Sequence, residues 1–282
     1  MPRRRPILIW RKAATARWLA KNEAHLHKCT DGTYAVIERP GRQRLIIEAV
    51  CHTAHAAREL REMFGGAIIE LPSDWEARAL ASTKTKPLRI GRRLIVASDE
   101  NDVTSDRATA VLIVPAGAAF GTGEHATTAM SLRMLERITR SLEPGWRMLD
   151  AGTGSGILAL AGRRFGSGKV VAIDNDPLAV STAKENGRRN NVRGIQFHVG
   201  DATTKQRGTF DIITANLYSE LLVAALPVWR ANLGRGARLV ISGVMRAQEG
   251  DLLRALRKNG YSTDETRRRG KWIALVCSQK RG

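Results

Sequence analysis

The chain has 282 residues, an apolar content of 43% and a formal net charge of +19, so it is long enough for two globular domains. The longest apolar stretch, residues 110–120, is interrupted by Pro115 and Gly117 and is shorter than the roughly 18–20 residues of a membrane span. The first residues also lack the apolar run of a secretory signal. Three scattered cysteines fit neither a disulfide framework nor a Cys-x-x-Cys metal site, so we expect a cytoplasmic protein without a metal centre.

The positive charge is spread along the whole chain. A field of this sign attracts nucleic acids and other polyanions, and it makes their association salt-dependent. A generally solvated basic surface would give the same composition. Both interpretations stay open, because the sequence does not show whether the cations gather on one face.

The first 71 residues predict a small α+β domain. Extended segments are expected at residues 7–10, 34–38, 45–50 and 67–71, and helices at 15–27 and 56–64. The order βαββαβ is that of a split βαβ, ferredoxin-like sandwich. Because no catalytic constellation is evident in residues 1–71, we expect this domain to recognise the substrate. Residues 72–107 are interpreted as a linker with one short strand at 94–97.

Residues 108–282 alternate strand and helix. Strands are predicted at 111–114, 147–150, 170–174, 195–199, 210–215, 237–242 and 272–277, and helices at 127–142, 155–165, 177–190, 218–232 and 246–258. This alternation is typical of a Rossmann-like α/β domain, whose parallel sheet is covered on both faces. Ligands of such sheets bind beyond the carboxyl ends of the strands.

A glycine-rich loop follows the strand that ends at Asp150. The sequence Asp150-Ala-Gly-Thr-Gly-Ser-Gly156 leads into a predicted helix, and Asp174 ends the next strand. Glycines remove Cβ atoms, so the backbone of Gly152 and Gly154 can approach a ligand closely. The whole unit predicts a cradle for a nucleoside-bearing cofactor, and the alternative is an ordinary Gly-rich turn.

The details of the loop select the cofactor. A dinucleotide fingerprint requires a third glycine at the position that Ile157 occupies. Asp150 would repel a pyrophosphate and suits a cationic ligand such as S-adenosylmethionine. Asp174 can accept hydrogen bonds from the two ribose hydroxyls.

Two further polar residues follow predicted strands, at Asp201 and Asn216. The carboxyl ends of parallel strands lie at one edge, so we expect both residues near Asp150 and Asp174. Asp201 is predicted to contact the adenine amino group. Taken singly, each of these residues is also compatible with a helix cap or a solvated loop.

Several motifs resemble those of the ribosomal protein L11 methyltransferases. The most specific is the segment at residues 119–128, which is similar to the family's F-G-T-G-x-H-x-T-T. The family's motifs also match the segments at residues 74–75, 89–94, 149–157, 174–177, 215–217, 239–243 and 271–275. The resemblance covers residues 72–282 and is weak in residues 1–71.

The resemblance implies a class I methyltransferase that uses S-adenosylmethionine and acts on amino groups of ribosomal protein L11, free or ribosome-bound. It assigns cofactor contacts to the positions of Thr128, Gly152, Asp174 and Asn216. We extend this predicted cofactor set to the neighbouring positions Phe120, Thr127, Asp150, Gly154 and Asp201. One departure from the family lies at Tyr218, which follows Asn216-Leu217.

The expected reaction is the in-line transfer of a methyl group from a sulfonium to an uncharged amine, so alignment and exclusion of water are expected to matter most. The side-chain oxygen of Asn216 and the backbone carbonyl of Leu217 can accept hydrogen bonds from the amine and aim its lone pair. Catalysis is therefore predicted at Asn216, Leu217 and His125. His125 could relay a proton, or it could brace the start of the helix at Thr127.

Alternative functions remain at this level. A methyltransferase acting on a base of ribosomal RNA would suit the charge of +19, although Asn216-Leu-Tyr218 lacks the prolines of an Asn-Pro-Pro-Tyr loop. A lysine methyltransferase with another protein substrate is the second alternative. The third is a binding module that has lost catalysis, against which the intact glycine loop argues. The basic surface could contact ribosomal RNA in any of these cases.

Overall fold

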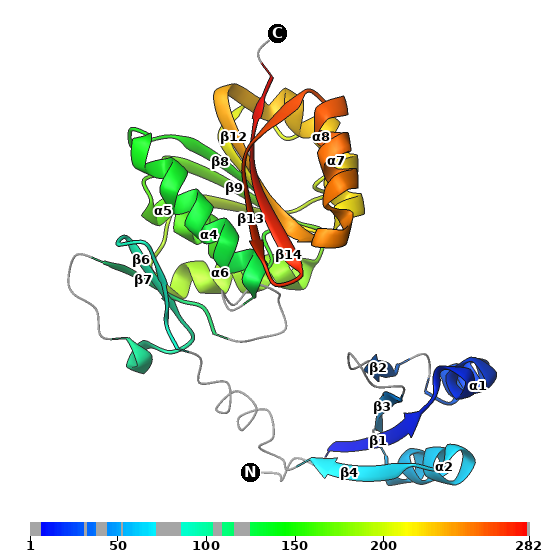
Figure 1. The fold of residues 1–282 in the computed structure, drawn as a ribbon. Helices are drawn as coiled ribbons and strands as arrows, with labels where there is room; N and C mark the ends of the chain where they lie inside the picture. Colours follow the sequence, from blue (N-terminus) through cyan, green and yellow to red (C-terminus); the bar gives the residue numbers. More distant parts are fainter. Residues whose placement is uncertain are drawn as a thin grey trace. The chain divides into compact units, whose positions relative to one another are not determined.

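The structure is a computed structural model that describes residues 7–30, 33–37, 44–51, 53–71, 86–103, 109–115 and 125–280. The chain divides into two compact units, Met1–Thr83 and Lys84–Gly282 (Figure 1). Within the described residues, no helix is long and apolar enough to cross a membrane.

Unit 1 is a four-stranded antiparallel sheet with two helices. Its elements are β1 (Ile7–Ala14), α1 (Ala16–Cys29), β2 (Ala35–Ile37), β3 (Leu45–Cys51), α2 (Ala54–Phe64) and β4 (Ala67–Leu71). The strand order is β2-β3-β1-β4, and every neighbouring pair is antiparallel. The predicted element order βαββαβ is confirmed for these residues.

Local sequence signals explain the two helices of unit 1. Thr15 and Thr53 cap them, each accepting a hydrogen bond from a backbone N–H three residues later. Gly65, with φ of 69°, ends α2 in a conformation that suits glycine. Trp10 and Phe64 are buried between sheet and helices, and the Trp10 Nε1–H donates to the Gly65 carbonyl at 2.8 Å.

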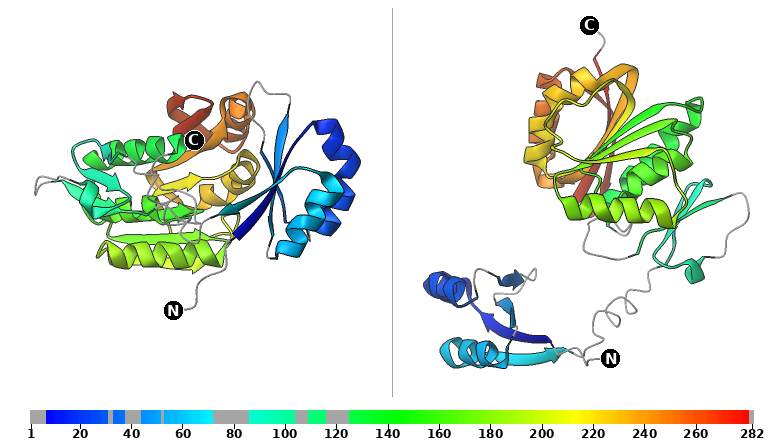
Figure 2. Two further views of the ribbon diagram at one scale, coloured as in Figure 1. Left: turned by 90° about the horizontal axis from the view of Figure 1, so that it is seen from below. Right: turned by 180° about the vertical axis from the view of Figure 1, so that it is seen from behind.

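Unit 2 is built on a seven-stranded sheet (Figure 2). Its strands are β8 (Arg147–Ala151), β9 (Lys169–Asp174), β10 (Ile195–Val199), β11 (Phe210–Asn216), β12 (Leu233–Met245), β13 (Tyr261–Arg269) and β14 (Trp272–Gln279). The order is β10-β9-β8-β11-β12-β14-β13, and all pairs are parallel except β12–β14 and β13–β14. The chain therefore switches direction across the sheet between β8 and β11, where such folds bind ligands.

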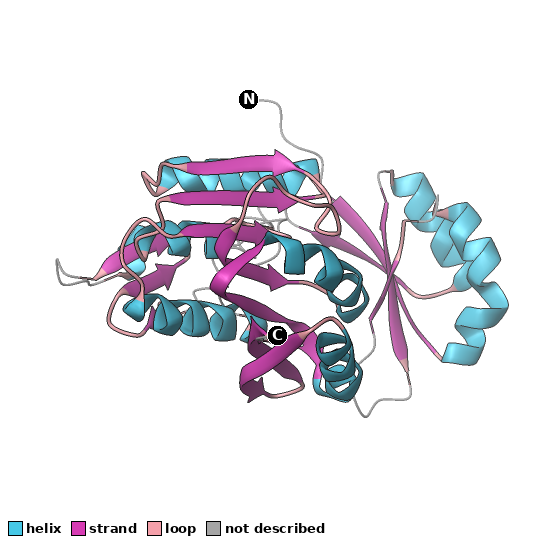
Figure 3. Ribbon diagram, turned by 90° about the horizontal axis from the view of Figure 1, so that it is seen from above, coloured by secondary structure: helices cyan, strands magenta, loops and turns pink. Residues whose placement is uncertain are grey.

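Helices cover both faces of this sheet, as the predicted Rossmann-like α/β class requires (Figure 3). One face carries α4 (Ala126–Ile138), α5 (Ile157–Arg164) and α6 (Pro177–Arg189), and the other carries α7 (Ser219–Asn232) and α8 (Glu249–Lys258). Single 3-10 turns lie at Glu100–Asp102, Thr139–Ser141 and Arg246–Gln248.

A three-stranded sheet joins unit 2 beside α4 and α5. It consists of β5 (Leu88–Ile90), β6 (Leu94–Ala97) and β7 (Ala110–Ile113), in that order. Residues 88–97 were assigned to the linker from the sequence, but all four side chains of β6 are buried and Leu94 and Val96 belong to the core around α4. Burial on this scale makes β5 and β6 part of unit 2. Residues 72–85 and 104–107 of the predicted linker lie outside the described residues.

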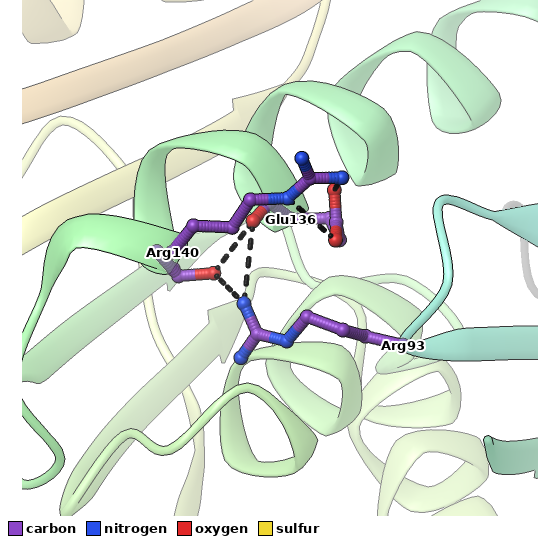
Figure 4. A network of polar contacts seen from close by, with 4 residues as sticks. Arg93, Glu136 and Arg140 are labelled. Carbon is purple, nitrogen blue, oxygen red and sulfur yellow. Dashed lines mark hydrogen bonds and ion pairs between the residues drawn. The ribbon is translucent and has the colours of Figure 1, made fainter. Parts of the chain in front are cut away.

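Arg93, in the turn between β5 and β6, ties this sheet to the helices (Figure 4). Its guanidinium donates to the Thr139 Oγ1 at 3.1 Å and to the Phe165 carbonyl at 2.9 Å. It also donates to the carbonyl of Glu136, whose nearly buried carboxylate pairs with Arg140 through two bonds of 3.0 Å. These charge-assisted bonds fix the position of the hairpin.

Asn190, just after α6, holds β7 with its side chain. The Ile113 N–H donates to Asn190 Oδ1 at 2.6 Å, and Asn190 Nδ2 donates to the Ile113 carbonyl at 2.8 Å. Asn190 is buried, and its amide thus bonds both backbone groups of one strand residue.

Two strand predictions require correction. β13 was not predicted, because Tyr261–Arg269 contains three consecutive arginines and no apolar alternation. The strand lies at the edge of the sheet, where charged residues are common. β12 begins at Leu233 rather than residue 237, because Gly234 and Gly236 hide its start from a pattern based on apolar residues. The other predicted helices and strands of unit 2 are present, with shifts of a few residues at their ends.

Candidate functional site

A cavity of about 360 Å³ lies at the carboxyl ends of β8, β9 and β11, beside the start of α4. It occupies the switch point of the sheet, which is the expected place for a ligand. Most of its wall is apolar or backbone. The lining residues are His125, Thr127, Thr128, Gly152, Thr153, Gly154, Ile157, Leu158, Asp174, Asn216, Leu217, Tyr218, Gly243 and Trp272.

The glycine loop forms one wall of the cavity. Gly152, Gly154 and Gly156 all have positive φ, at 74°, 54° and 83°, which explains the glycine at each position. The N–H groups of Gly152 and Thr153 both donate to the Ile173 carbonyl at 2.9 Å. A Cβ on Gly152 would lie 2.3 Å from the Leu217 side chain, which would have to move to make room for it.

Asp174 lines the cavity beside this loop. Its Oδ2 accepts from the Gly154 N–H at 2.9 Å, and its Oδ1 accepts from the Asp176 N–H at 3.1 Å. The carboxylate is therefore oriented by backbone at the end of β9. Each oxygen keeps a further lone pair that can accept a hydroxyl proton from a ligand.

Asp150 has a different place from the one predicted. It is fully buried and does not line the cavity; its two oxygens accept from Thr153 Oγ1 at 2.7 Å and Thr214 Oγ1 at 2.6 Å. Burial raises the pKa of Asp150 to about 6, although these hydrogen bonds act in the opposite direction. Because Asp150 and Thr214 are register partners on β8 and β11, the carboxylate braces the loop from below.

Asp201 also lies away from the lining residues. It is exposed beyond β10, and its Oδ1 accepts from the Thr203 N–H at 2.7 Å, which lowers the pKa of the carboxyl. Its predicted contact with adenine stays a prediction. Phe120 lies outside the described residues.

Asn216 ends β11 on the opposite wall. Its Nδ2 donates to Thr128 Oγ1 at 3.2 Å, so the first turn of α4 sets the orientation of the amide. Its Oδ1 is buried and has no hydrogen-bond partner among the described residues. An unsatisfied buried acceptor is costly, which marks Oδ1 as a position for a ligand donor.

The backbone of Leu217 is fixed beside Asn216. Its N–H donates to the Ser242 carbonyl at 3.1 Å. Gly243 has φ of 91°, and a Cβ there would lie 2.3 Å from the Leu217 carbonyl oxygen. Gly243 was not predicted as a site residue and stood only within a family-like segment, yet this glycine lets Leu217 take its place in the wall.

His125 and Trp272 form the third side of the cavity. The His125 Nδ1 lies 2.7 Å from Thr127 Oγ1, and its ring meets the Trp272 ring edge-on at 4.9 Å. Burial, and secondarily the charge of Lys271, lower the pKa of His125. Both causes favour the neutral imidazole, and the buried Thr127 is held by His125 at the start of α4.

The structure thus brings together most of the predicted site residues. Trp272 was missed as a site residue, because it lies on β14, far along the chain; its only signal was the family-like segment at residues 271–275. Tyr218 also lines the cavity and is 78% exposed, so its ring is available to a partner. The described residues contain no group of three or more His, Cys, Asp or Glu side chains that could hold a metal ion.

Comparisons with known proteins agree on one family. The sequence model of the ribosomal protein L11 methyltransferase family matches residues 50–280. A ribosomal protein L11 methyltransferase of Pelotomaculum thermopropionicum is 39% identical over 196 residues, covering 69% of this chain and 63% of the relative. A protein of the same name from Pelobacter propionicus is 40% identical over 215 residues, covering 72% and 66%.

The solved structures include a relative with the same architecture. The ribosomal protein L11 methylase of Lactobacillus delbrueckii subsp. bulgaricus superposes with a TM-score of 0.64 at 29% identity, covering 70% of this chain and all of that one. The matches to the two curated relatives span less than two thirds of their length.

Proposed function

Because the chain belongs to the ribosomal protein L11 methyltransferase family, we propose that it transfers methyl groups from S-adenosylmethionine to amino groups of ribosomal protein L11. The targets are lysine side chains, the N-terminal amine, or both. The family match disfavours the RNA-base alternative. We expect the reaction to take place in the cytoplasm, where ribosomal proteins are made.

The cavity fits the cofactor. Gly152 and Gly154 leave a backbone cradle without Cβ atoms, and the oriented Asp174 carboxylate can receive two ribose hydroxyls. Bound S-adenosylmethionine supplies an electrophilic methyl group on a sulfonium. The apolar wall of Ile157, Leu158 and Leu217 keeps water from the reaction, which matters because the charge on sulfur disperses in the transition state.

The observation that carries the proposal is the buried Asn216 Oδ1, which lacks a hydrogen-bond partner among the described residues. An amine N–H can donate to it, while Nδ2 is occupied by its bond to the Thr128 hydroxyl. The Leu217 carbonyl, packed against Gly243, offers a second acceptor. Two acceptors hold the neutral amine with its lone pair toward the methyl group.

A proton must leave the amine during the reaction. The amide of Asn216 cannot take it at neutral pH, whereas neutral His125 at the cavity wall can. We assign His125 the role of proton acceptor, directly or through water. Unit 1 carries the ferredoxin-like topology and recognises the folded substrate, and unit 2 performs the chemistry.

The test is methyl transfer from labelled S-adenosylmethionine to purified L11, alone and in ribosomes, with the sites located by mass spectrometry. We expect label on L11 amines in at least one of the two forms. Asn216→Ala should abolish most of the label, whereas Gln196→Ala, an exposed position on β10, should not. Label on RNA instead of protein would refute the proposal.

A further inference from the structure

Five cationic side chains line the seam between α4 and the hairpin of β13 and β14, next to the cavity. We name them the basic strip: Arg133 and Arg137 on α4, Arg267 and Arg269 on β13, and Lys271 in the hairpin turn. Helix α4 packs against both hairpin strands (Figure 1). The proposed methyl transfer uses none of the five.

The register of the hairpin places the arginines. Arg267 pairs with Ala274 and Arg269 with Trp272, and both partners pack in the core that contains α4. The intervening Arg268 pairs with Ile273, which belongs to the core on the other face. Side chains alternate along a strand, so Arg267 and Arg269 lie on the α4 side and Arg268 lies on the α8 side.

The strip has more charge than its neighbours neutralise. Glu265 forms ion pairs with both Arg137 and Arg267. Within the described part of the chain, Arg133, Arg269 and Lys271 form no ion pair with a carboxylate. By contrast, Arg268 on the opposite face is paired with Glu249.

The cations also act on one another. Burial, and then the charges of Arg269 and Arg267, lower the pKa of Arg133. Like charges held this close repel one another, and an anion bound between them would offset the repulsion. The strip is thus poised to bind an external polyanion.

The strip ends at the cavity. The Lys271 Nζ lies 5.3 Å from the centre of the Trp272 ring, and Trp272 lines the cavity with His125. A polyanion on the strip would therefore lie beside the site where the amine enters.

We propose that the basic strip binds the phosphate backbone of RNA that accompanies the protein substrate. Guanidinium groups match phosphates in geometry, and nucleic-acid interfaces are much more positively charged than protein interfaces. Unit 2 contains 32 Lys and Arg against 18 Asp and Glu, so its field favours the same partner. The choice of RNA rests on the proposed function, since a ribosomal protein binds its RNA in the ribosome.

The test measures RNA binding alone, without cofactor or L11. Fluorescence anisotropy of a labelled single-stranded RNA 20-mer is followed over a salt series, for the wild-type chain and for the triple variant Arg133→Gln, Arg267→Gln, Arg269→Gln. Each lost phosphate contact should reduce the slope of log affinity against log salt by about 0.7, so the triple variant should lose about 2 in slope and at least about tenfold in affinity at low salt.

Two controls keep the result specific. The first control is Arg268→Gln, since Arg268 lies on the same strand but faces away from the strip. The second is the double variant Lys184→Gln, Arg188→Gln, which removes two exposed cations from α6. In both controls the salt slope should differ from the wild-type slope by no more than the value of about one phosphate contact. In addition, photocrosslinking of wild-type protein to RNA should label peptides from residues 126–138 and 261–280.

An unchanged slope in the triple variant, or crosslinks only elsewhere, would overturn the assignment. So would tighter binding of labelled polyglutamate than of RNA at equal charge, because that result would indicate a surface for acidic protein. Each of these outcomes is independent of whether the chain methylates L11.

Discussion

The two walls of the cavity differ in how their polar groups are used. In the glycine-loop wall, Asp174 is oriented by two backbone N–H groups, and Asp150, buried behind this wall, has both oxygens bonded. In the opposite wall, Asn216 is anchored through Nδ2, while its Oδ1 has no partner within the described residues. The polar groups of the first wall are hydrogen-bonded within the protein, whereas the second wall keeps one hydrogen-bond acceptor for a ligand.

This difference separates two tasks. A cofactor with many polar atoms needs a rigid cradle, which hydrogen bonds within the loop provide. An incoming amine needs a single acceptor in a fixed direction, and pre-organisation of that acceptor lowers the cost of alignment. Substitutions in the two walls should therefore fail in different ways.

The largest effect is expected at Gly243, which lets Leu217 enter the acceptor wall. In Gly243→Ala, the new Cβ meets backbone atoms of Leu217 and the positive φ adds strain, so unfolding free energy should fall by roughly 2–5 kcal/mol and turnover with it. Gly236→Ala is the matched control, because its φ of 76° is similar but nothing lies within 4 Å of the added Cβ. Urea denaturation of both variants measures the difference. Equal losses would show that backbone strain alone matters.

The second effect concerns Asp150, which is buried behind the cradle wall. Its folded pKa of about 6 lies above the unfolded value of 3.8, so the folded state holds the proton more tightly. Asp150 should therefore destabilise the protein as pH rises from about 4 to 6, by roughly 3 kcal/mol in total. In Asp150→Asn this loss should be absent, because an amide does not titrate in this range. The hydroxyls of Thr153 and Thr214 can rotate to bond the amide.

Unfolding free energies of wild type and Asp150→Asn, compared at pH 4.5, 5.5 and 7.5, check this prediction. At each step to higher pH, the unfolding free energy of the variant should rise relative to that of wild type. A difference that is constant with pH would mean that Asp150 titrates normally.

The third effect tests the acceptor wall itself. Asn216→Ala should lower kcat by about 10²-fold with little change in the KM for cofactor, because the amine loses its alignment. Asn216→Asp should also be slow at neutral pH, since a carboxylate favours the protonated amine, and should partly recover as pH rises. Wild-type kcat in both variants would remove Asn216 from the site.

The last effect concerns the cofactor contacts of Asp174. Asp174→Ala should weaken S-adenosylmethionine binding by about 1.5–3 kcal/mol for each charged hydrogen bond lost, while NAD should bind neither form. Calorimetry measures both ligands. The KM for the protein substrate should change little, because Asp174 does not lie in the acceptor wall. An unaltered affinity for the cofactor would show that Asp174 has only a structural role.

Much of both walls was predictable from the sequence. The glycine loop, Asp174 and Asn216 lie at strand ends in a βαβ unit, where local signals and the parallel plan determine their placement together. The side of the sheet that Asp150 faces was not predictable in this way. It depends on Thr214, a register partner 64 residues later that is visible only once β8 and β11 pair.

The third side of the cavity was less predictable for the same reason. Trp272 reaches the site through antiparallel pairing of β14 with β12, and β13 contains no apolar alternation. The strand predicted at residues 94–97 is present as β6, but the burial of β5 and β6 was not predictable, because it depends on α4 and α5. Long-range contacts of this kind leave no local pattern.

The clamp that Asn190 places on Ile113 has a consequence for self-association. Strand edges offer backbone donors and acceptors to other chains, and aggregation begins where such groups stay unpaired. Here a side chain occupies both groups of one residue of β7, so an incoming strand finds no partner at that position. The Ile113 amide should exchange its hydrogen slowly, and Asn190→Ala should both speed that exchange and make the protein more prone to aggregate.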